Sequence, residues 1–169
     1  MSKLERVNFE QFESVFDRIG KDWMLIGASD GERDNVMTAS WGCLGYLWRR
    51  PVAVCFIRPQ RYTYGITEQS ERLSLSFFEG EAHRDALVFC GRNSGRDGDK
   101  FERSGLTKAF SENGVPYPDE ASFVLLCRKL YADDIKECAF VDKSILEEYK
   151  AQDYHRVYIC EIEEILCKK

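Results

Sequence analysis

Two short segments with different hydrophobic patterns restrict the fold of this 169-residue chain more than any other feature of its sequence. Residues 52–57 are a continuously apolar run between Pro51 and Pro59, which is typical of a strand buried on both faces. Residues 73–77 alternate strictly, so that two leucines and a phenylalanine occupy one face of a strand and two serines the other. Both patterns indicate β-structure.

The other segments add strands and short helices in no regular order. The further strand candidates are residues 23–28, 123–131 and 154–166, and the short helical segments are residues 83–90, 99–103 and 143–150. The strands and helices do not alternate regularly, and the Gly-rich dinucleotide fingerprint is missing. Both observations argue against a doubly wound parallel sheet. We predict one domain over residues 1–169, mainly β and antiparallel: a small barrel with short helices.

Residues 1–20 are expected to form a helical extension of this domain. After Asn8, four large apolar residues recur at steps of three and four, which is one face of a helix, and Gly20 marks the predicted end. These residues are Phe9, Phe12, Phe16 and Ile19.

The composition excludes several classes of protein. The net charge is −5, and no block of Lys and Arg provides a footprint for nucleic acid or an anionic membrane. No apolar stretch approaches the ~20 residues needed to span a bilayer, and the N-terminus lacks a signal-peptide core. The seven cysteines include no C-x-x-C pair, which favours free thiols over a disulfide framework. Free thiols are typical of a cytoplasmic protein, and we expect these cysteines to serve mainly in core packing.

Residues 35–48 carry no charge, although 31% of the chain is charged. Their content of Thr, Ser, Asn and Gly is too high for a plain core strand, so several polar groups here are expected to have partners. Thr38 and Ser40 point the same way on an extended strand, with the small Ala39 between them. A flat ligand lying over this strand, with Trp41 as a wall, explains the pattern. A strand whose hydroxyls cap a neighbouring turn explains it equally well.

A second polar cluster follows the apolar strand, at residues 57–66. Arg58 and Arg61 stand at the end of that strand, and Thr63 is a candidate N-cap for a helix running to about Ser70. Guanidinium groups next to a helix N-terminus make a natural phosphate site. The alternative is a pair of ordinary surface arginines.

Two further features lie downstream. The Gly-rich segment 91–100 matches neither phosphate-binding loop, and its plainest interpretation is a solvated connection capped by Asp97 or Asp99. Lys100 is the exception, because a cation at a loop–helix junction can point into a neighbouring site. The two histidines, His83 and His155, lie far apart without carboxylates at metal-ligand spacing, which argues against a zinc or iron centre.

Together these motifs resemble the flavin reductase-like, FMN-binding split-barrel family, which includes flavoredoxin. The resemblance rests on Asn-x-Met-Thr-x-Ser-Trp at 35–41 and Ile-Arg-Pro-x-Arg-Tyr-Thr at 57–63, followed by Ser-Leu-Ser-Phe-Phe at 74–78. It extends to Cys-Gly-Arg-x-Ser-Gly-Arg-Asp-x-Asp-Lys at 90–100 and Asp-Tyr-His-Arg at 153–156. It therefore covers most of the chain after the N-terminal extension and implies an FMN-binding split β-barrel.

The resemblance also implies a set of cofactor-binding residues. Asn35, Thr38, Ala39, Ser40 and Trp41 are expected to contact the flavin ring, Arg58, Arg61 and Thr63 to surround the phosphate, and Lys100 to lie near either; His155 joins them through its motif. The family is homodimeric, with FMN held non-covalently near the subunit interface. Its members take electrons from NADH or NADPH and pass them through flavin to a small-molecule or protein acceptor.

Two alternatives to this oxidoreductase remain open. One is a flavin-binding electron carrier or sensor that a partner protein reduces, without a nicotinamide site of its own. The other is a split barrel that has lost flavin and serves only in assembly. Hydride transfer to flavin needs no protein acid or base, so the motifs assign no catalytic residue.

Overall fold

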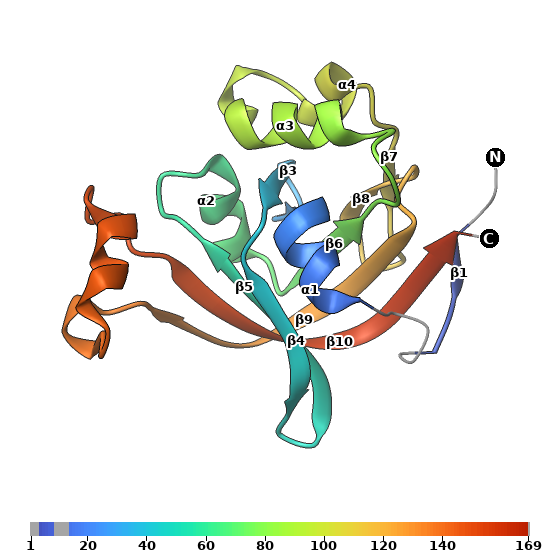
Figure 1. Ribbon diagram of the computed structural model, residues 1–169. Helices are drawn as coiled ribbons and strands as arrows, with labels where there is room; N and C mark the ends of the chain where they lie inside the picture. Colours follow the sequence, from blue (N-terminus) through green and yellow to red (C-terminus); the bar gives the residue numbers. More distant parts are fainter. Residues whose placement is uncertain (1–3, 9–13, 169) are drawn as a thin grey trace.

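The computed structural model, which describes residues 4–8 and 14–168, is a curled antiparallel sheet with helices packed outside it (Figure 1). The strands of the large sheet are β1 (Leu4–Arg6), β2 (Met24–Ser29), β3 (Asp34–Ala39), β4 (Gly42–Leu47), β5 (Arg50–Ile57), β6 (Arg72–Phe77), β9 (Phe123–Asp134) and β10 (Arg156–Lys168). A separate hairpin consists of β7 (Lys108–Phe110) and β8 (Pro116–Pro118).

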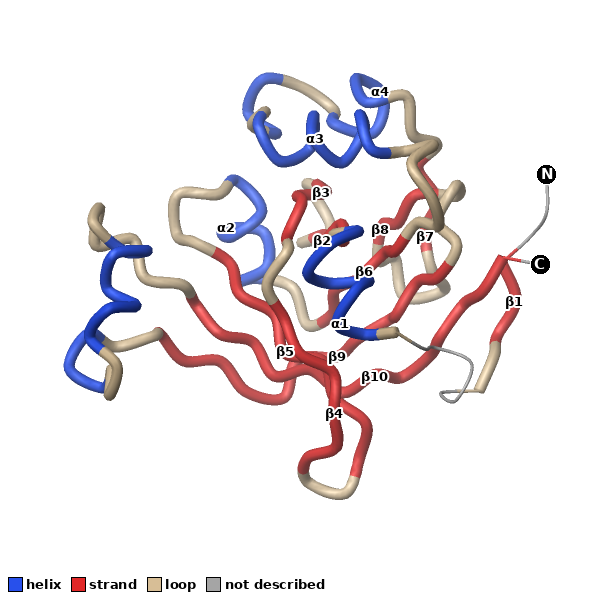
Figure 2. Tube along the Cα trace, viewed as in Figure 1, coloured by secondary structure: helices blue, strands red, loops and turns tan. Residues whose placement is uncertain are grey.

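Short helices connect the strands (Figure 2). They are α1 (Val15–Asp17), the π-helical η2 (Arg18–Asp22), α2 (Tyr62–Gln69), α3 (Arg84–Arg92), α4 (Lys100–Ser104) and the 3₁₀ turns η3 (Gly95–Asp97), η4 (Glu137–Ala139) and η5 (Lys143–Tyr149). The last two belong to a projection between β9 and β10, residues 135–155, which we call the β9–β10 arm. The backbone hydrogen bond from the Ile135 N–H to the His155 carbonyl, 2.9 Å, closes the base of this arm.

The strand order explains why the sheet curls. It runs β3-β2-β6-β9-β10-β5-β4, with β1 added beside β10, and every described pairing is antiparallel. The strands at the two ends of this order, β3 and β4, are joined by Ser40 and Trp41 alone. The predicted mainly β, antiparallel architecture is therefore confirmed, and the two-residue link draws the two edges of the sheet toward each other.

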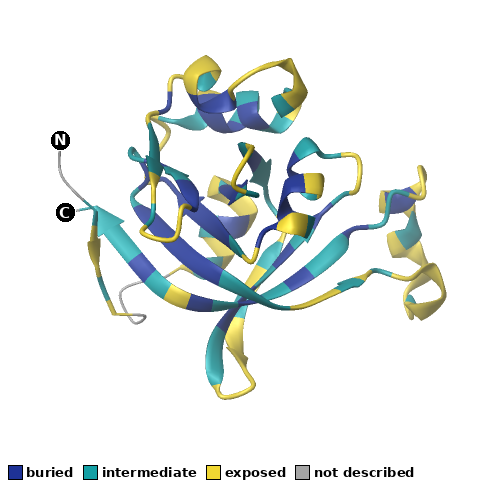
Figure 3. Cartoon of the chain, turned by 180° about the vertical axis from the view of Figure 1, so that it is seen from behind, coloured by how far each residue is buried: buried dark blue, intermediate teal, exposed yellow. Residues whose placement is uncertain are grey.

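Two apolar layers stabilise this arrangement. Inside the curl, the inward side chains of β5, β6, β9 and β10 form one buried cluster, of which Tyr158 and Phe77 are the largest members. On the outer face of β2, β3 and β9, a second cluster packs beneath α3 and α4, with Leu87 and Phe101 at its centre. The helices thus cover one half of the outer face, whereas the half formed by β4, β5 and β10 is only partly buried (Figure 3).

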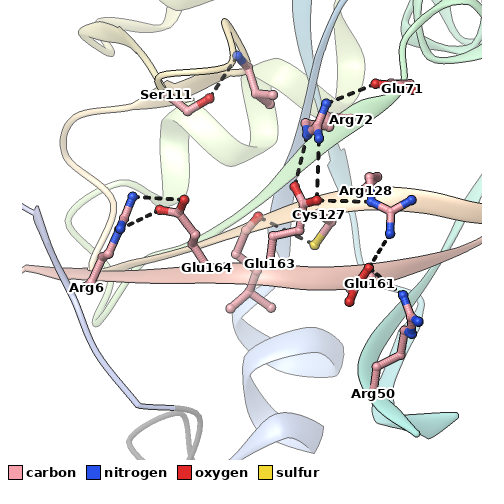
Figure 4. A network of polar contacts seen from close by, with 12 residues as sticks. Arg6, Arg50, Glu71, Arg72, Ser111, Cys127, Arg128, Glu161, Glu163 and Glu164 are labelled. Atoms are coloured by element: carbon pink, nitrogen blue, oxygen red, sulfur yellow. Dashed lines mark hydrogen bonds and ion pairs between the residues drawn. The ribbon is translucent and has the colours of Figure 1, made fainter. Parts of the chain in front are cut away.

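A ladder of ion pairs borders this uncovered half (Figure 4). Arg128 on β9 reaches Glu161 at 2.5 Å and Glu163 at 3.1 Å, both on β10. Arg50 and Arg72 extend the ladder to β5 and β6 with contacts of 2.9 Å to the same two glutamates. Pairs this exposed contribute little stability individually, so the ladder chiefly keeps this part of the sheet polar.

The structure corrects three sequence predictions. Residues Leu4–Arg6 of the expected helical extension form β1, paired with the end of β10, and the helix continues past Gly20 to Asp22. Part of the expected apolar helix face, Phe9 and Phe12, lies outside the described residues, and Phe16 is 94% exposed.

The seven cysteines differ in exposure. All seven are free, as predicted, but Cys43 and Cys138 are exposed, so packing accounts only for the buried ones.

Across the described residues, no helix is both long and apolar enough to cross a membrane.

Candidate functional site

The start of α2, the beginning of β3 and the loop after α3 enclose a cavity of about 180 Å³. We call it the cation cavity, because Arg61, Arg92, Arg96 and Lys100 line it and no Asp or Glu does so among the described residues. Its remaining lining residues are polar or small: Asn35, Gln60, Tyr62, Thr63, Gly91, Asn93, Ser94 and Gly95.

Two of these cations share one backbone oxygen. Lys100 Nζ donates to the Cys90 carbonyl at 2.6 Å, and the Arg61 guanidinium donates to the same carbonyl at 3.3 Å. Lys100 is only 2% exposed, although it stands at the first position of α4. Neither cation has a carboxylate within ion-pair distance among the described residues.

Burial makes this arrangement electrostatically unfavourable on its own. Desolvation, with a smaller contribution from the nearby Arg61 charge, lowers the pKa of Lys100 to about 8. Desolvation also lowers the pKa of Arg61. A buried ammonium, Lys100, beside a half-buried guanidinium, Arg61, without a counterion is stabilised when an anion enters the cavity.

Backbone groups of α2 add to the attraction for an anion. The helix begins at Tyr62, and its N-cap residue, Arg61, makes no side-chain capping bond. The predicted N-cap role of Thr63 is therefore wrong: Thr63 lies within the first turn, and its buried hydroxyl accepts a hydrogen bond of 2.8 Å from Asn35 Nδ2. The free end of the helix still provides N–H groups and a positive dipole end at the cavity.

The Gly-rich loop belongs to the site, which sequence reasoning missed. Asn93, Ser94 and Gly95 line the cation cavity, and a Cβ on Gly95 would lie 2.5 Å from Asn35 Oδ1. A glycine is thus required for the loop to approach β3 so closely. The predicted cap by Asp99 is confirmed, because its carboxylate accepts a bond of 2.8 Å from the Phe101 N–H.

A second cavity, of about 170 Å³, lies beside the first, and Arg61 lines both. We call it the tryptophan cavity. Its other lining residues are Met37, Thr38, Ala39, Ser40, Trp41, Phe56, Arg58 and His155. Trp41 is 43% exposed, and the Thr38 hydroxyl donates to the Leu87 carbonyl of α3 at 2.5 Å.

Arg58 is held away from the cation cavity. Its guanidinium pairs with the Asp153 carboxylate and donates to the Glu148 carbonyl at 3.0 Å, so it joins the end of β5 to the β9–β10 arm. The Arg58 pairing lowers the pKa of Asp153. The guanidinium carbon also lies 5.3 Å from the Tyr149 ring and 6.0 Å from the Trp41 ring.

His155 closes the tryptophan cavity from the side of the arm. It is 7% exposed, and its ring centroid lies 5.1 Å from that of Trp41. Burial, with a smaller contribution from Arg58, lowers the pKa of His155 to about 4, so the imidazole is neutral at neutral pH. Its Nδ1 forms a hydrogen bond of 2.9 Å with the Tyr149 hydroxyl.

The structure thus divides the ten residues singled out from the sequence between two adjacent cavities. Asn35, Thr63 and Lys100 line the first, Thr38, Ala39, Ser40, Trp41, Arg58 and His155 line the second, and Arg61 lines both. Sequence reasoning did not find Tyr149 or Asp153 as partners of the site. The signal available was the Asp-Tyr-His-Arg motif, which contains Asp153 and begins four residues after Tyr149.

The comparisons with known proteins agree with this architecture. The flavin reductase like domain matches residues 16–169. The chain belongs to the flavin reductase-like family. No curated protein matches the sequence.

Solved structures of this family share its fold at low sequence identity. An FMN-binding domain of a flavin reductase-like enzyme from Shewanella baltica is 16% identical with a TM-score of 0.71, over 99% of this chain and 78% of that one. Flavoredoxin of Desulfovibrio vulgaris is 21% identical with a TM-score of 0.67, over 87% and 69% of the two chains. An FMN-binding protein from Thermus thermophilus with bound 1-cyclohex-2-enone is 21% identical with a TM-score of 0.66, over 91% and 74%.

Proposed function

We propose that this flavin reductase-like protein binds FMN non-covalently and passes electrons from NADH or NADPH through it to an acceptor. The observation that carries the proposal is a pair of cations, the buried Lys100 and the half-buried Arg61, which share the Cys90 carbonyl beside an aromatic cavity. The match to the flavin reductase like domain supports it.

The two cavities fit the two ends of FMN. A phosphate monoester carries close to two negative charges, which balance Arg61 and Lys100 and accept hydrogen bonds from the start of α2. An isoalloxazine ring is wide and flat, and the tryptophan cavity offers Trp41, Phe56 and the small residues at the end of β3. Together the cavities reach the lower end of the ~300–1,000 Å³ typical of ligand sites.

The residues of the chain then have separate tasks. Bound FMN would supply the two-electron chemistry. Lys100 and Arg61 neutralise the phosphate, Asn35 and Thr63 fix the loop and helix around it, and Trp41 limits access of water to the ring. His155 and Arg58 place a neutral and a charged polar group in the tryptophan cavity.

The test begins with flavin binding. Purified protein is titrated with FMN and with riboflavin, which lacks the phosphate, and we expect tighter binding of FMN. The FMN complex is then mixed anaerobically with NADH or NADPH in a stopped-flow instrument, and loss of the visible flavin absorbance reports reduction.

Three outcomes are distinguishable. Rapid bleaching by either nicotinamide supports an oxidoreductase. A yellow protein that neither nicotinamide reduces would instead be a flavin-binding electron carrier or sensor, served by a partner protein. Failure to bind FMN rejects the proposal and favours a split barrel used only in assembly.

The proposal includes a homodimer, supported by the uncovered half of the sheet. Cys43, Val54, Ile159 and Tyr131 are neighbours in register across β4, β5, β10 and β9. They point away from the core, because the alternate residues on β5 and β10 fill it. Such an apolar row, continuing into the tryptophan cavity through Phe56, suits an interface between copies with FMN close to it.

Light scattering during size-exclusion chromatography tests the dimer. We expect a mass about twice the 19.6 kDa of the chain, and a shift toward monomer in Ile159→Lys. Val141→Lys is the control, since Val141 is 99% exposed on the arm. A wild-type monomer would contradict the dimer.

A cytoplasmic location also remains part of the proposal, supported by the seven free thiols.

A further inference from the structure

Tyr149 and His155 form a buried pair at the edge of the tryptophan cavity. The Tyr149 hydroxyl lies 2.9 Å from His155 Nδ1, and both side chains are at least nine-tenths buried. The two rings meet edge to face, with centroids 5.6 Å apart. This bond ties the histidine of the cavity to η5 of the β9–β10 arm.

The arm holds Tyr149 firmly in this position. Tyr154 stacks on its ring with centroids 4.9 Å apart, and the Arg58 guanidinium covers it at 5.3 Å. Arg58 in turn pairs with Asp153. Arg58 and Asp153 are the charged groups that bear on His155, and the remaining close rings, Trp41 and Phe56, are not titratable.

The opposite edge of the imidazole is free to serve a ligand. His155 lines the cavity, and its Nε2 has no hydrogen-bond partner among the described residues. A neutral imidazole carries its one proton on either nitrogen, and the bond made by one nitrogen decides the state of the other. A phenol is a better donor than a neutral imidazole, and the imine nitrogen is the better acceptor.

We propose that Tyr149 is a positioning residue, which donates a hydrogen bond from its hydroxyl to His155 Nδ1 and thereby makes Nε2–H a fixed donor for a carbonyl oxygen of the ligand in the tryptophan cavity. The identity of that ligand rests on the proposed function. Both a flavin ring and a carbonyl-bearing acceptor offer such an oxygen. A neutral N–H donor binds a carbonyl without requiring the cavity to hold another charge beside Arg58 and Arg61.

Long-range ¹H–¹⁵N correlation spectra of the ligand-free protein test the tautomer directly. The chain has only two histidines, so His83→Gln assigns the His155 signals. We expect the Nε2–H tautomer in the wild type and a mixture of both tautomers in Tyr149→Phe. Tyr154→Phe is the matched control, because it removes a neighbouring hydroxyl and keeps the bond to His155. Nδ1–H in the wild type, or an unchanged tautomer in Tyr149→Phe, overturns the proposal.

Lumiflavin, an isoalloxazine without the phosphate chain, tests the consequence for binding. We expect Tyr149→Phe to weaken lumiflavin binding about three- to tenfold, as loss of one oriented hydrogen bond should, with Tyr154→Phe unchanged. Equal affinity in wild type and Tyr149→Phe would contradict the role in ligand binding. If the wild type binds no lumiflavin, the flavin proposal fails, and the tautomer spectra still decide the role of Tyr149.

Discussion

Arg58 and Asp153 form an ion pair that links the end of β5 to the last residues of the β9–β10 arm. Gln60 Nε2 joins it with a bond of 2.6 Å to the same carboxylate. Both charged side chains are less than a quarter exposed. The pair thus sets the position of the arm, and with it one wall of the tryptophan cavity.

Asp153→Asn should loosen the arm without unfolding the sheet. The variant retains the shape of the side chain but removes the charge that Arg58 and Gln60 engage. We expect faster hydrogen–deuterium exchange in residues 137–155 and unchanged exchange in β6 and β9, measured by mass spectrometry. Glu147→Gln is the control, because that exposed carboxylate pairs only with Lys150 among the described residues. Equal protection of the arm in both variants would show that the ion pair does not hold it.

The same pair also has a pH dependence of known sign. The folded state lowers the pKa of Asp153, so its contribution to stability is present above the unfolded pKa of about 4 and is lost as pH falls through the folded pKa. Protection of the arm, measured relative to the intrinsic exchange rate at each pH, should therefore fall below about pH 4 in the wild type but not further in Asp153→Asn.

Arg58 and Arg61 should differ in their effect on phosphate recognition, although they lie three residues apart. We expect Arg61→Ala to weaken FMN binding by about 1.5–3 kcal/mol while changing riboflavin affinity much less, because a charge-assisted phosphate contact is lost. Arg58→Ala should affect both flavins alike, since Arg58 lies in the tryptophan cavity. Fluorescence titration of the two flavins measures both. Selective loss of FMN affinity in Arg58→Ala would reverse the assignment.

The division between these arginines shows what the sequence could predict. Strands such as β5 and β6 were found because their hydrophobic patterns are local. The expected burial of β5 on both faces was wrong, since Val54 and Phe56 on its outer face are only half-buried. The partners of Arg58 and Arg61 were not found: Asp153 is 95 residues from Arg58, and the oxygen that Arg61 and Lys100 share is a backbone carbonyl. No residue type marks a carbonyl, so no sequence pattern points to it.

The uncharged stretch at residues 35–48 was interpreted only half correctly. Asn35 is buried and residues 38–41 line a cavity, in agreement with a segment held against core or ligand. Tyr46 and Trp48, in contrast, are 75% and 53% exposed. Tyr46 lies on the edge strand β4 and Trp48 in the turn that follows it. In the proposed dimer, the second copy of the chain would cover them.

Gly27 should be intolerant of any side chain. A Cβ at this position of β2 would lie 2.3 Å from the Pro116 carbonyl oxygen of β8 and 2.5 Å from Ser74 Oγ. Ser74 itself donates to that carbonyl at 2.6 Å, so the substitution displaces a buried hydrogen bond as well. We expect Gly27→Ala to lower the free energy of unfolding by about 1–3 kcal/mol in urea titrations. Gly45→Ala, whose Cβ would meet nothing within 4 Å, is the matched control and should change stability little.

Lys100 should make anion binding depend on pH in a defined direction. Its pKa of about 8 lies below the ordinary value, so the ammonium begins to lose its proton just above neutrality, and a dianion in the cation cavity then faces less positive charge. We expect FMN affinity to fall as pH rises from 7 to 9, with proton uptake on binding near pH 8 detected by calorimetry in buffers of different ionisation enthalpy. Lys100→Met should bind FMN more weakly at pH 7 and lose this dependence, whereas the exposed Lys150→Met should retain it. An unchanged pH profile in Lys100→Met would remove Lys100 from the phosphate site.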